Sequence, residues 1–197
     1  MFIFDHHFWA DMWVAIGVVA LAVVFLFWLS LIYAQLKTGV PPMPAKSAEA
    51  EIAINLLSES MSGVDKKQGH APVTGKTIYE LGSGWGGLVS RLSKRFPEHQ
   101  IVGYEISFLP YWVARWRLRR CKNVTLYRKD FLQAKLTDVA GVICYLMIKP
   151  MPKVADLLDR QLVSGTPVVS LAFWFRHRSP DRSTSFDQGP GVALYHW

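Results

Sequence analysis

A glycine-rich turn constrains the fold of this chain more than any other part of the sequence. Four glycines lie close together in it: Gly82, Gly84, Gly86 and Gly87. The residues before the turn, 76–79, are β-branched and aromatic and predict a strand, whereas residues 88–96 have the apolar spacing of a helix. Because glycine adopts positive φ and lets the backbone approach a ligand, a strand, turn and helix in this order predict an α/β fold with a ligand site at the turn.

Strand and helix patterns alternate along the rest of the chain. Helices are predicted over residues 46–61, 108–120 and 152–162, and strands over 100–105, 123–128, 139–147, 166–173 and 192–197. This alternation predicts right-handed crossovers and a Rossmann-like, doubly wound, mostly parallel sheet with helices on both faces. No helix separates the last two predicted strands, so we expect the last strand to be antiparallel.

Glu80, at the end of the first predicted strand, discriminates between two classes of cofactor. Gly82, Gly84 and Gly87 satisfy the G-x-G-x-x-G pattern of dinucleotide sites. A dinucleotide, however, lays an anionic pyrophosphate against this turn, and a carboxylate repels it. S-adenosylmethionine carries a cationic sulfonium and ammonium, which a carboxylate attracts. The motif therefore favours S-adenosylmethionine, with a dinucleotide and a ligand-free glycine turn as the alternatives.

Two more acids follow predicted strands. Glu105 ends the second strand, where a carboxylate accepts hydrogen bonds from ribose hydroxyls, although nicotinamide sites use the same contact. Asp130 follows the third strand and suits the exocyclic amine of adenine, with Phe131 beside the ring. The structural alternatives are a solvated strand-end acid for Glu105 and a turn cap for Asp130.

An apolar segment near the N-terminus predicts a membrane anchor. No charged residue occurs from Met12 to Leu36, and about 22 helical residues span roughly 33 Å, the thickness of a bilayer core. No basic residue precedes the segment and no small-x-small cleavage site follows it, which favours an uncleaved single-pass anchor over a signal peptide. Lys37 and Lys46 follow it, which predicts insertion in the inner (cytoplasmic) membrane with the catalytic domain on the cytoplasmic side.

We divide the chain into three parts on this basis. Residues 1–37 form the anchor, residues 38–62 a proline-rich linker with an N-terminal helix, and residues 63–197 the S-adenosylmethionine-binding domain. All 22 Lys and Arg residues and 13 of the 15 acidic residues follow the anchor segment, an excess of nine positive charges. Nucleic acid, an acidic protein and the anionic inner leaflet all attract such a charge. The anchor favours the lipid bilayer, and we expect no nucleic-acid partner.

Cysteine and histidine usage predicts no metal. The two cysteines, Cys121 and Cys144, make no disulfide framework, and the six histidines lack ligand spacing.

The helix predicted over residues 108–120 combines tryptophan with arginine. One interpretation packs it on the sheet through Trp112, Val113 and Trp116 and leaves the arginines in solvent. The other adds contact of the arginines with lipid headgroups or an acidic substrate.

The series Glu80–Gly86, Gly103-Tyr104-Glu105 and Lys129-Asp130 resembles motifs of the class I, seven-strand S-adenosylmethionine-dependent methyltransferases. Together with the apolar segment and Val40–Pro44, it resembles the membrane-anchored protein-lysine methyltransferases that act on the c-ring protein of ATP synthase and the adenine nucleotide translocase. The resemblance implies a methyltransferase of a membrane protein. It also implies the donor-binding residues, which are Glu80, Gly82, Ser83, Gly84, Gly86, Glu105, Ile106, Asp130 and Phe131.

Two positions depart from the family pattern. Trp85 occupies the place of an acid before the third glycine, and Lys149 is added to the loop after the fourth strand. That loop lacks the Asn/Asp-Pro-Pro-aromatic signature of enzymes that methylate planar amide or base nitrogens. We expect Tyr145, Lys149 and Trp174 to line the acceptor pocket, with ordinary strand-end packing as the alternative, and the sequence identifies no general base.

Several functions are compatible with these patterns. We expect an enzyme that N-methylates a lysine of a membrane protein. The alternatives are a methyltransferase of a lipid or quinone-like molecule, a non-catalytic donor-binding assembly factor, and a nicotinamide oxidoreductase.

Overall fold

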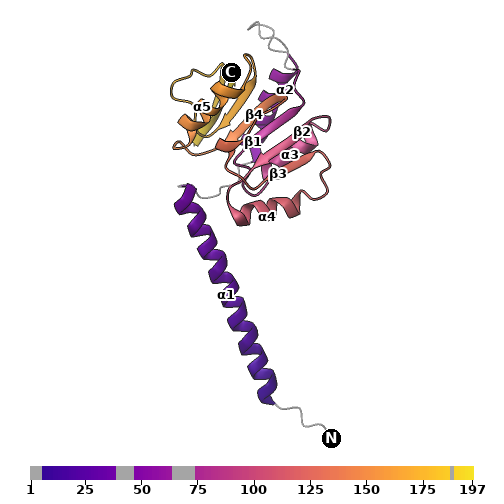
Figure 1. The fold of residues 1–197 in the computed structure, drawn as a ribbon, viewed down its shortest axis with the longest axis vertical. Coiled ribbons are helices and arrows are strands. Elements are labelled where there is room, and N and C mark those ends of the chain that lie inside the picture. Colours follow the sequence, from indigo (N-terminus) through magenta and orange to yellow (C-terminus); the bar gives the residue numbers. More distant parts are fainter. Residues whose placement is uncertain (1–5, 39–46, 64–73, 187–188) are drawn as a thin grey trace. The chain divides into compact units, whose positions relative to one another are not determined.

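The computed structural model describes residues 6–38, 47–63, 74–186 and 189–197. The chain forms two compact units, Met1–Pro41 and Pro42–Trp197 (Figure 1). In the first unit, helix α1 (His6–Thr38) contains the stretch Trp9–Leu29, none of which is buried and which is long and apolar enough to cross a membrane. The predicted proline-rich element at residues 39–44 lies outside the described residues.

The second unit is built on a seven-stranded sheet. Its strands are β1 (Thr77–Leu81), β2 (Gln100–Tyr104), β3 (Val124–Tyr127), β4 (Val139–Tyr145), β5 (Pro167–Leu171), β6 (Arg182–Phe186) and β7 (Gly189–His196). They lie in the order β3-β2-β1-β4-β5-β7-β6. Strands β1 to β5 are parallel, whereas β7 is antiparallel to β5 and β6 is antiparallel to β7. The predicted Rossmann-like, mostly parallel sheet with an antiparallel last strand is confirmed.

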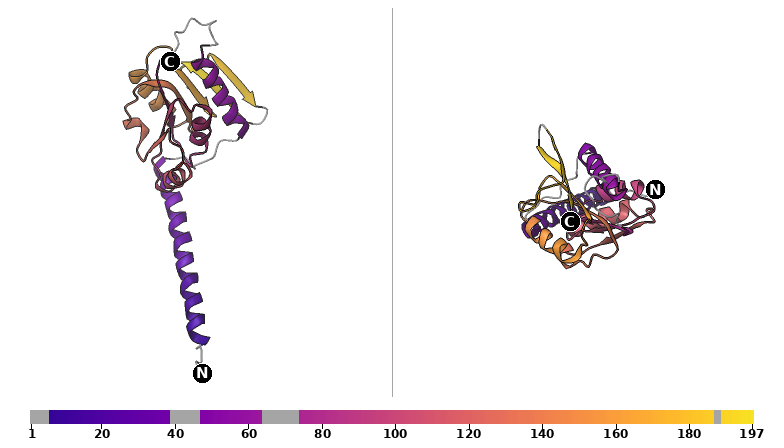
Figure 2. Two further views of the ribbon diagram at one scale, coloured as in Figure 1. Left: turned by 90° about the vertical axis from the view of Figure 1, so that its right-hand side faces the viewer. Right: turned by 90° about the horizontal axis from the view of Figure 1, so that it is seen from above.

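Helices cover both faces of this sheet (Figure 2). Among its described residues this unit contains the helices α2 (Ser47–Met61), α3 (Gly87–Arg95), α4 (Phe108–Arg117), the short 3-10 helix η2 (Phe131–Gln133) and α5 (Met151–Gln161). Buried apolar side chains of α2 and α3 and Ala114 of α4 share one hydrophobic cluster, and those of α5 belong to the other. The crossovers from β1 to β3 and from β4 to β5 run in opposite directions along the sheet, which puts their helices on opposite faces.

Helix α2 is part of the domain core. Ala53, Ile54 and Leu57 are buried against the sheet, and a Cβ on Gly141 of β4 would meet the Leu57 side chain at 2.7 Å. Glycine at that position therefore lets α2 approach the sheet closely. Truncating a fully buried leucine such as Leu57 to alanine costs about 2–5 kcal/mol of stability.

Two features differ from the sequence prediction. Strand β6 was not predicted, because its polar sequence Arg-Ser-Thr-Ser-Phe carries no apolar alternation and it pairs only with β7 at the edge of the sheet. In α4 the predicted packing through Trp112 and Trp116 is wrong. The helix instead buries Tyr111 and Ala114 and exposes both tryptophans, and the small Ala114 allows it to pack closely at Gly86.

Candidate functional site

The glycine turn between β1 and α3 has three residues in the left-handed region. Gly82, Gly84 and Gly86 have φ of 84°, 49° and 74°, a conformation that side chains with a Cβ rarely adopt. A Cβ on Gly86 would lie 2.8 Å from the Ala114 Cβ of α4, whereas one on Gly84 would meet nothing within 4 Å. Gly87 begins α3. The turn therefore packs against α4 at Gly86 and is open at Gly84.

Glu80 is the most deeply buried acid of the site. Its side chain lies on β1, with 2% of its surface exposed, and its Oε2 has no hydrogen-bond partner among the described residues. Burial and the nearby Glu105 carboxylate raise the pKa of Glu80 well above its ordinary value, while a hydrogen bond from the Val89 backbone N–H opposes the shift. The Ser83 Oγ is likewise buried without a partner in the described part of the chain. Buried polar atoms in this state are costly, and a ligand that pairs with them relieves the cost.

Glu105 is also buried, but each of its two carboxylate oxygens already accepts one hydrogen bond. One oxygen accepts a hydrogen bond from the Gly84 N–H at 2.8 Å, and the other accepts from the Ser107 N–H at 2.7 Å. These bonds join the end of β2 to the glycine turn and fix the backbone of both. Ile106 lies between the two anchored residues and is partly exposed.

Asp130 caps the helix that follows it. One carboxylate oxygen accepts a hydrogen bond from the Leu132 N–H at 2.9 Å, at the start of η2. Phe131 is partly buried and packs against the hydrophobic cluster that contains the buried side chains of α5. The capping role weighed for Asp130 is therefore present, and it leaves the side chain at the end of β3, on the same edge as Glu105.

The register brings the first two acids together. β1 pairs with β2 on one side and with β4 on the other, so that Glu80 faces Gly103 and Ile143 across the neighbouring strands. The strand order reverses between β1 and β4. In open α/β sheets, ligands bind at the carboxyl ends of the strands where this reversal occurs.

A small cavity of about 120 Å³ opens beside the glycine turn. Glu80, Trp85, Arg91, Arg117 and Tyr145 are among its lining residues. The Arg117 guanidinium donates a hydrogen bond to the Trp85 carbonyl at 3.2 Å. Burial raises the pKa of the Tyr145 hydroxyl, so this phenol is neutral at physiological pH.

A larger cavity of about 420 Å³ lies beside α5. Lys149 and Trp174 line it together with Met151 and Phe175, and the Trp174 Nε1 is buried without a hydrogen-bond partner in the described structure. The three predicted acceptor-pocket residues therefore fall into two places. Tyr145 lies with Glu80 beside the glycine turn, and Lys149 and Trp174 lie beside α5.

Arg91 and Arg117 were not identified as site residues from the sequence. Arg91 lies on α3, donating hydrogen bonds to Glu51 at 2.7 Å and to the Ser47 hydroxyl at 2.9 Å. Arg117 lies at the end of α4. The position of Arg91 four residues after the turn was the only available signal, since the packing of α2 and α4 around the turn is a tertiary feature. Over the described ranges, no group of three or more His, Cys, Asp or Glu side chains is placed to hold a metal ion.

The arrangement suits a cationic ligand with a nucleoside end. Two buried carboxylates, Glu80 and Glu105, lie at neighbouring strand ends, and the unpartnered Glu80 Oε2 is a site for an ammonium or sulfonium group. A pyrophosphate would add two negative charges beside them. The residues thus fit S-adenosylmethionine better than a dinucleotide.

Comparison with known proteins agrees with this fit. Residues 80–182 match the model of a family described as the ANTKMT methyltransferase domain. The chain is similar to a lysine N-methyltransferase of the ATP synthase C-subunit from Rattus norvegicus, with 25% identity over 152 residues, covering 75% of this chain and 62% of the relative. It is also similar to the Homo sapiens protein of the same description, with 25% identity over 111 residues, covering 55% of this chain and 47% of the relative.

The chain therefore spans less than two thirds of the length of these relatives.

Among solved structures, an RNA methyltransferase from Salinibacter ruber in complex with S-adenosyl-L-homocysteine has a TM-score of 0.66 and 24% identity, covering 78% of this chain and 93% of that chain. A precorrin-6y C5,15-methyltransferase from Geobacter metallireducens has a TM-score of 0.53 and 18% identity, covering 66% of this chain and 63% of that chain. Both show that the fold is that of a methyltransferase domain.

Proposed function

Because the chain belongs to the ANTKMT methyltransferase domain family, we propose that it is a membrane-anchored, S-adenosylmethionine-dependent enzyme that N-methylates a lysine side chain of a membrane protein. The observation that carries this proposal is the buried Glu80 carboxylate at the glycine turn, whose Oε2 has no hydrogen-bond partner among the described residues. The two neighbouring carboxylates, Glu80 and Glu105, complement the positive charge of a cationic methyl donor. The similarity to two lysine N-methyltransferases of the ATP synthase C-subunit supports a lysine of a membrane protein as the acceptor.

Residues at the ends of different strands are assigned to different parts of the donor. We assign the ammonium of the donor to Glu80, the ribose hydroxyls to Glu105 and the adenine to Asp130 and Phe131. Gly82, Gly84 and Gly86 give the turn its left-handed backbone, against which the donor lies at the open position Gly84, and Ser83 and Ile106 flank it. When bound, S-adenosylmethionine supplies a methyl group on a cationic sulfur, and the S–C bond breaks as the N–C bond to the acceptor forms.

The chain's own contribution to the chemistry is to present a neutral amine. A lysine must lose its proton before it can attack, and nearby positive charges lower the pKa of an amine. Arg117 lines the same small cavity as Glu80 and provides such a charge, whereas the charge of Arg91 in that cavity is paired with Glu51. The neutral Tyr145 hydroxyl, which also lines this cavity, is placed to orient the amine by a hydrogen bond rather than to remove its proton.

The apolar helix α1 explains the choice of acceptor. Its stretch Trp9–Leu29 is long enough to span a bilayer, and tethering an enzyme to the membrane of its substrate raises their effective concentration. The basic residues after the stretch support a cytoplasmic orientation of the catalytic domain in the inner membrane. Residues 1–37 would then act as the anchor, residues 38–62 as a proline-rich linker and an N-terminal helix, and residues 63–197 as the S-adenosylmethionine-binding domain, whose core that helix completes.

The test is methylation in native membranes. Membranes from cells with and without the full chain are incubated with S-adenosylmethionine labelled on its methyl group. We expect label in a small membrane protein, located on a lysine by mass spectrometry and absent with the Glu80→Gln variant. Label confined to the organic-soluble lipid fraction would indicate a lipid or quinone-like acceptor, and donor binding without label in any fraction would indicate a non-catalytic factor.

The Tyr145→Phe variant tests the acceptor side separately. Removing one orienting hydrogen bond should lower kcat about tenfold, while the affinity for the donor stays unchanged because no donor contact is assigned to the hydroxyl. An unchanged kcat would remove Tyr145 from the site. The Trp174→Phe variant, with kcat and donor affinity measured in the same way, tests whether the cavity beside α5 belongs to the acceptor site.

A further inference from the structure

Helix α4 directs large aromatic side chains into solvent. Phe108, Trp112 and Trp116 are exposed by 58%, 46% and 68%, and their spacing of four residues places them on one stripe of the helix. The opposite side of α4 is the one that packs, through Pro110, Tyr111 and Ala114. Three large exposed aromatics on one helix exceed what a solvated helix face requires, and such patches are typical of interaction sites.

An arginine guanidinium group lies over each of these aromatic rings. The guanidinium carbon of Arg128 lies 5.6 Å from the Phe108 ring centre, that of Arg115 lies 5.3 Å from Trp112 and that of Arg119 lies 4.5 Å from Trp116. We call these six side chains the α4 face. A surface that alternates aromatic rings with guanidinium groups matches the interfacial region of a bilayer, where the rings sit at headgroup level and the cations reach phosphate.

The charge around the α4 face has one sign. Residues 106–129 contain seven Lys and Arg residues and no Asp or Glu. A helix that only needed solubility would mix charges of both signs, as α5 does. The complementary partner is therefore anionic, and an anionic lipid surface combines that charge with an apolar layer for the rings.

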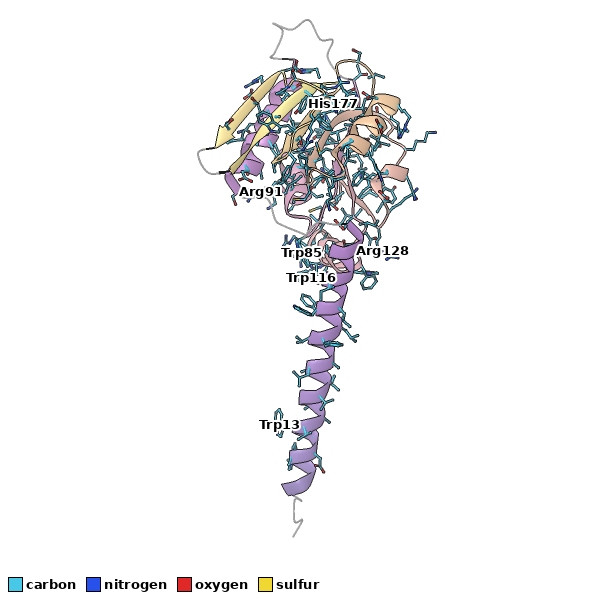
Figure 3. The ribbon with its side chains drawn as sticks, turned by 90° about the vertical axis from the view of Figure 1, so that its left-hand side faces the viewer. Trp13, Trp85, Arg91, Trp116, Arg128 and His177 are labelled. Atoms are coloured by element: carbon cyan, nitrogen blue, oxygen red, sulfur yellow. The ribbon has the colours of Figure 1, made fainter. Side chains whose placement is uncertain are left out.

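Helix α4 contacts the glycine turn through residues outside the α4 face. Gly86 of the turn packs against Ala114 of α4, and Arg117 of α4 holds the Trp85 carbonyl at 3.2 Å. Figure 3 shows Trp85, Trp116 and Arg128 toward the same end of the domain, with His177 toward the other end. A surface that binds the α4 face thus lies beside the edge of the sheet where the methyl donor is assigned.

We propose that the α4 face docks on anionic lipid and lays the donor edge of the sheet at the headgroup layer of the membrane. The proposal rests on the proposed anchor, and it deepens the proposed function by giving the catalytic domain an orientation. Lysines that flank membrane segments sit at this depth. The anchor supplies proximity, and the α4 face supplies alignment of the site with the acceptor.

RNA is the rival partner, because aromatic rings and arginines also bind single-stranded nucleic acid. The apolar helix α1 favours lipid, since it would hold the domain beside a bilayer. The experiment below therefore includes an RNA arm.

An environment-sensitive probe on the full chain tests the docking. A Trp112→Cys variant, with Cys121→Ser, is labelled with a nitrobenzoxadiazole probe and reconstituted in nanodiscs of phosphatidylcholine with or without phosphatidylglycerol. The control is Val163→Cys in the same background, since Val163 is also apolar and 70% exposed but lies in the connection before β5, at the amino ends of the strands. Thermal melting checks that both labelled proteins remain folded.

With anionic discs we expect the emission of the probe at position 112 to shift to shorter wavelength and to be quenched by a lipid-borne quencher. The probe at position 163 should show neither effect. Raising the salt concentration, or adding Arg115→Ser and Arg119→Ser, should reverse the shift. With phosphatidylcholine alone the shift should be at least fivefold smaller.

Equal behaviour of the two probes in anionic discs would overturn the docking, as would an equal shift with both lipids. A shift with an RNA oligonucleotide but none with anionic discs would assign the face to nucleic acid instead. These results are separate from the proposed function. Co-purification of the protein with the discs reports on the anchor, and labelling of a membrane protein reports on methyl transfer, so each can fail without the other. A protein that does not enter the discs would overturn the anchor and the docking together.

Discussion

The ends of β1 and β3 both carry an acid on the same edge of the sheet, but the two acids are in opposite states. Glu80 on β1 is buried, with one oxygen lacking a partner in the described residues, whereas Asp130 after β3 is partly exposed and caps η2. The fold gains a helix cap from Asp130, but from Glu80 it gains one hydrogen bond at the cost of a buried carboxyl group. A residue that the fold tolerates at a cost is the stronger indication of a ligand.

Glu105, which directly follows β2, is intermediate between Glu80 and Asp130. It is buried like Glu80, yet its two oxygens bond the Gly84 and Ser107 backbone N–H groups. Its carboxylate therefore organises the glycine turn before any ligand arrives. The comparison predicts that donor affinity falls by different amounts when each acid is replaced by its amide, because the amide keeps the shape of the side chain and removes its charge.

The largest effect is expected for Glu80→Gln. The amide can still accept the hydrogen bond from the Val89 N–H, so the fold is retained, but the charge that faces the cationic donor is lost. We expect donor affinity to fall about 100-fold, or ~3 kcal/mol, as for the loss of one partner of a buried charge pair. Isothermal titration calorimetry with S-adenosylmethionine measures it.

S-adenosylhomocysteine sharpens this prediction, because it keeps the ammonium but lacks the sulfonium charge. If Glu80 pairs with the ammonium, as assigned, the variant loses affinity for both ligands equally. A loss confined to S-adenosylmethionine would place the sulfonium against Glu80 instead, and no loss for either ligand would remove Glu80 from the site.

The second effect is that of Glu105→Gln. The amide group keeps one acceptor oxygen but places an NH2 against the other backbone N–H, so one of the two bonds is lost and the turn loosens. We expect the free energy of unfolding to fall by about 1–3 kcal/mol and donor affinity to fall about tenfold. Chemical denaturation and calorimetry on the same sample separate the two. A loss of affinity without a loss of stability would contradict the organising role.

The pH dependence follows from the raised pKa of Glu80. Between the ordinary glutamate pKa of about 4.3 and the raised value, the folded donor-free protein holds a proton that the unfolded chain has released. The contribution of Glu80 to stability is therefore present below this window and is lost as pH rises through it. Thermal melts from about pH 4 to 8 should show the wild type losing stability relative to Glu80→Gln as pH rises.

The donor should reverse this dependence. A cation favours the ionised carboxylate, so binding releases a proton from Glu80 and wild-type affinity rises with pH across the same window. Calorimetry in two buffers of different ionisation enthalpy measures the released proton. No proton release in the wild type, or the same release from Glu80→Gln, would contradict the assignment.

The sequence predicted the alternation of elements, the antiparallel last strand and the strand-end acids, because these follow from local periodicity and from the rule that parallel strands end at one edge. It could not predict that Gly84 bonds Glu105, since that bond joins residues 21 positions apart. It also missed strand β6, whose pattern is polar, and Arg91 and Arg117, whose positions depend on how α3 and α4 pack around the turn.

Helix α4 shows the limit most clearly. Tryptophan is usually buried on average, so Trp112 and Trp116 were expected to pack on the sheet. The helix packs instead through Tyr111 and Ala114, and the Cβ clearance at Gly86 shows why. A large side chain at position 114 would collide with the glycine turn, since the Ala114 Cβ lies only 2.8 Å from a Cβ added at Gly86. The close packing of α4 on the glycine turn at Gly86 therefore favours burial of the face that carries Ala114.

The smallest effect is expected for Asp130→Asn. The amide oxygen can accept the Leu132 N–H as the carboxylate does, so the cap is retained, and only a charge at a partly exposed position is removed. We expect less than about 0.5 kcal/mol in stability, as for surface substitutions, and a two- to threefold loss of donor affinity, since an amide oxygen still accepts from the adenine amine. Asp130→Ala, which removes both acceptors, should cost about 1 kcal/mol through the cap and weaken the donor further. The result that contradicts this expectation is a loss of donor affinity in Asp130→Asn as large as that in Glu80→Gln. In that case, the hydrogen bonds of an acid in the folded chain would not predict its importance for donor binding, and the comparison of Glu80 with Asp130 would be wrong.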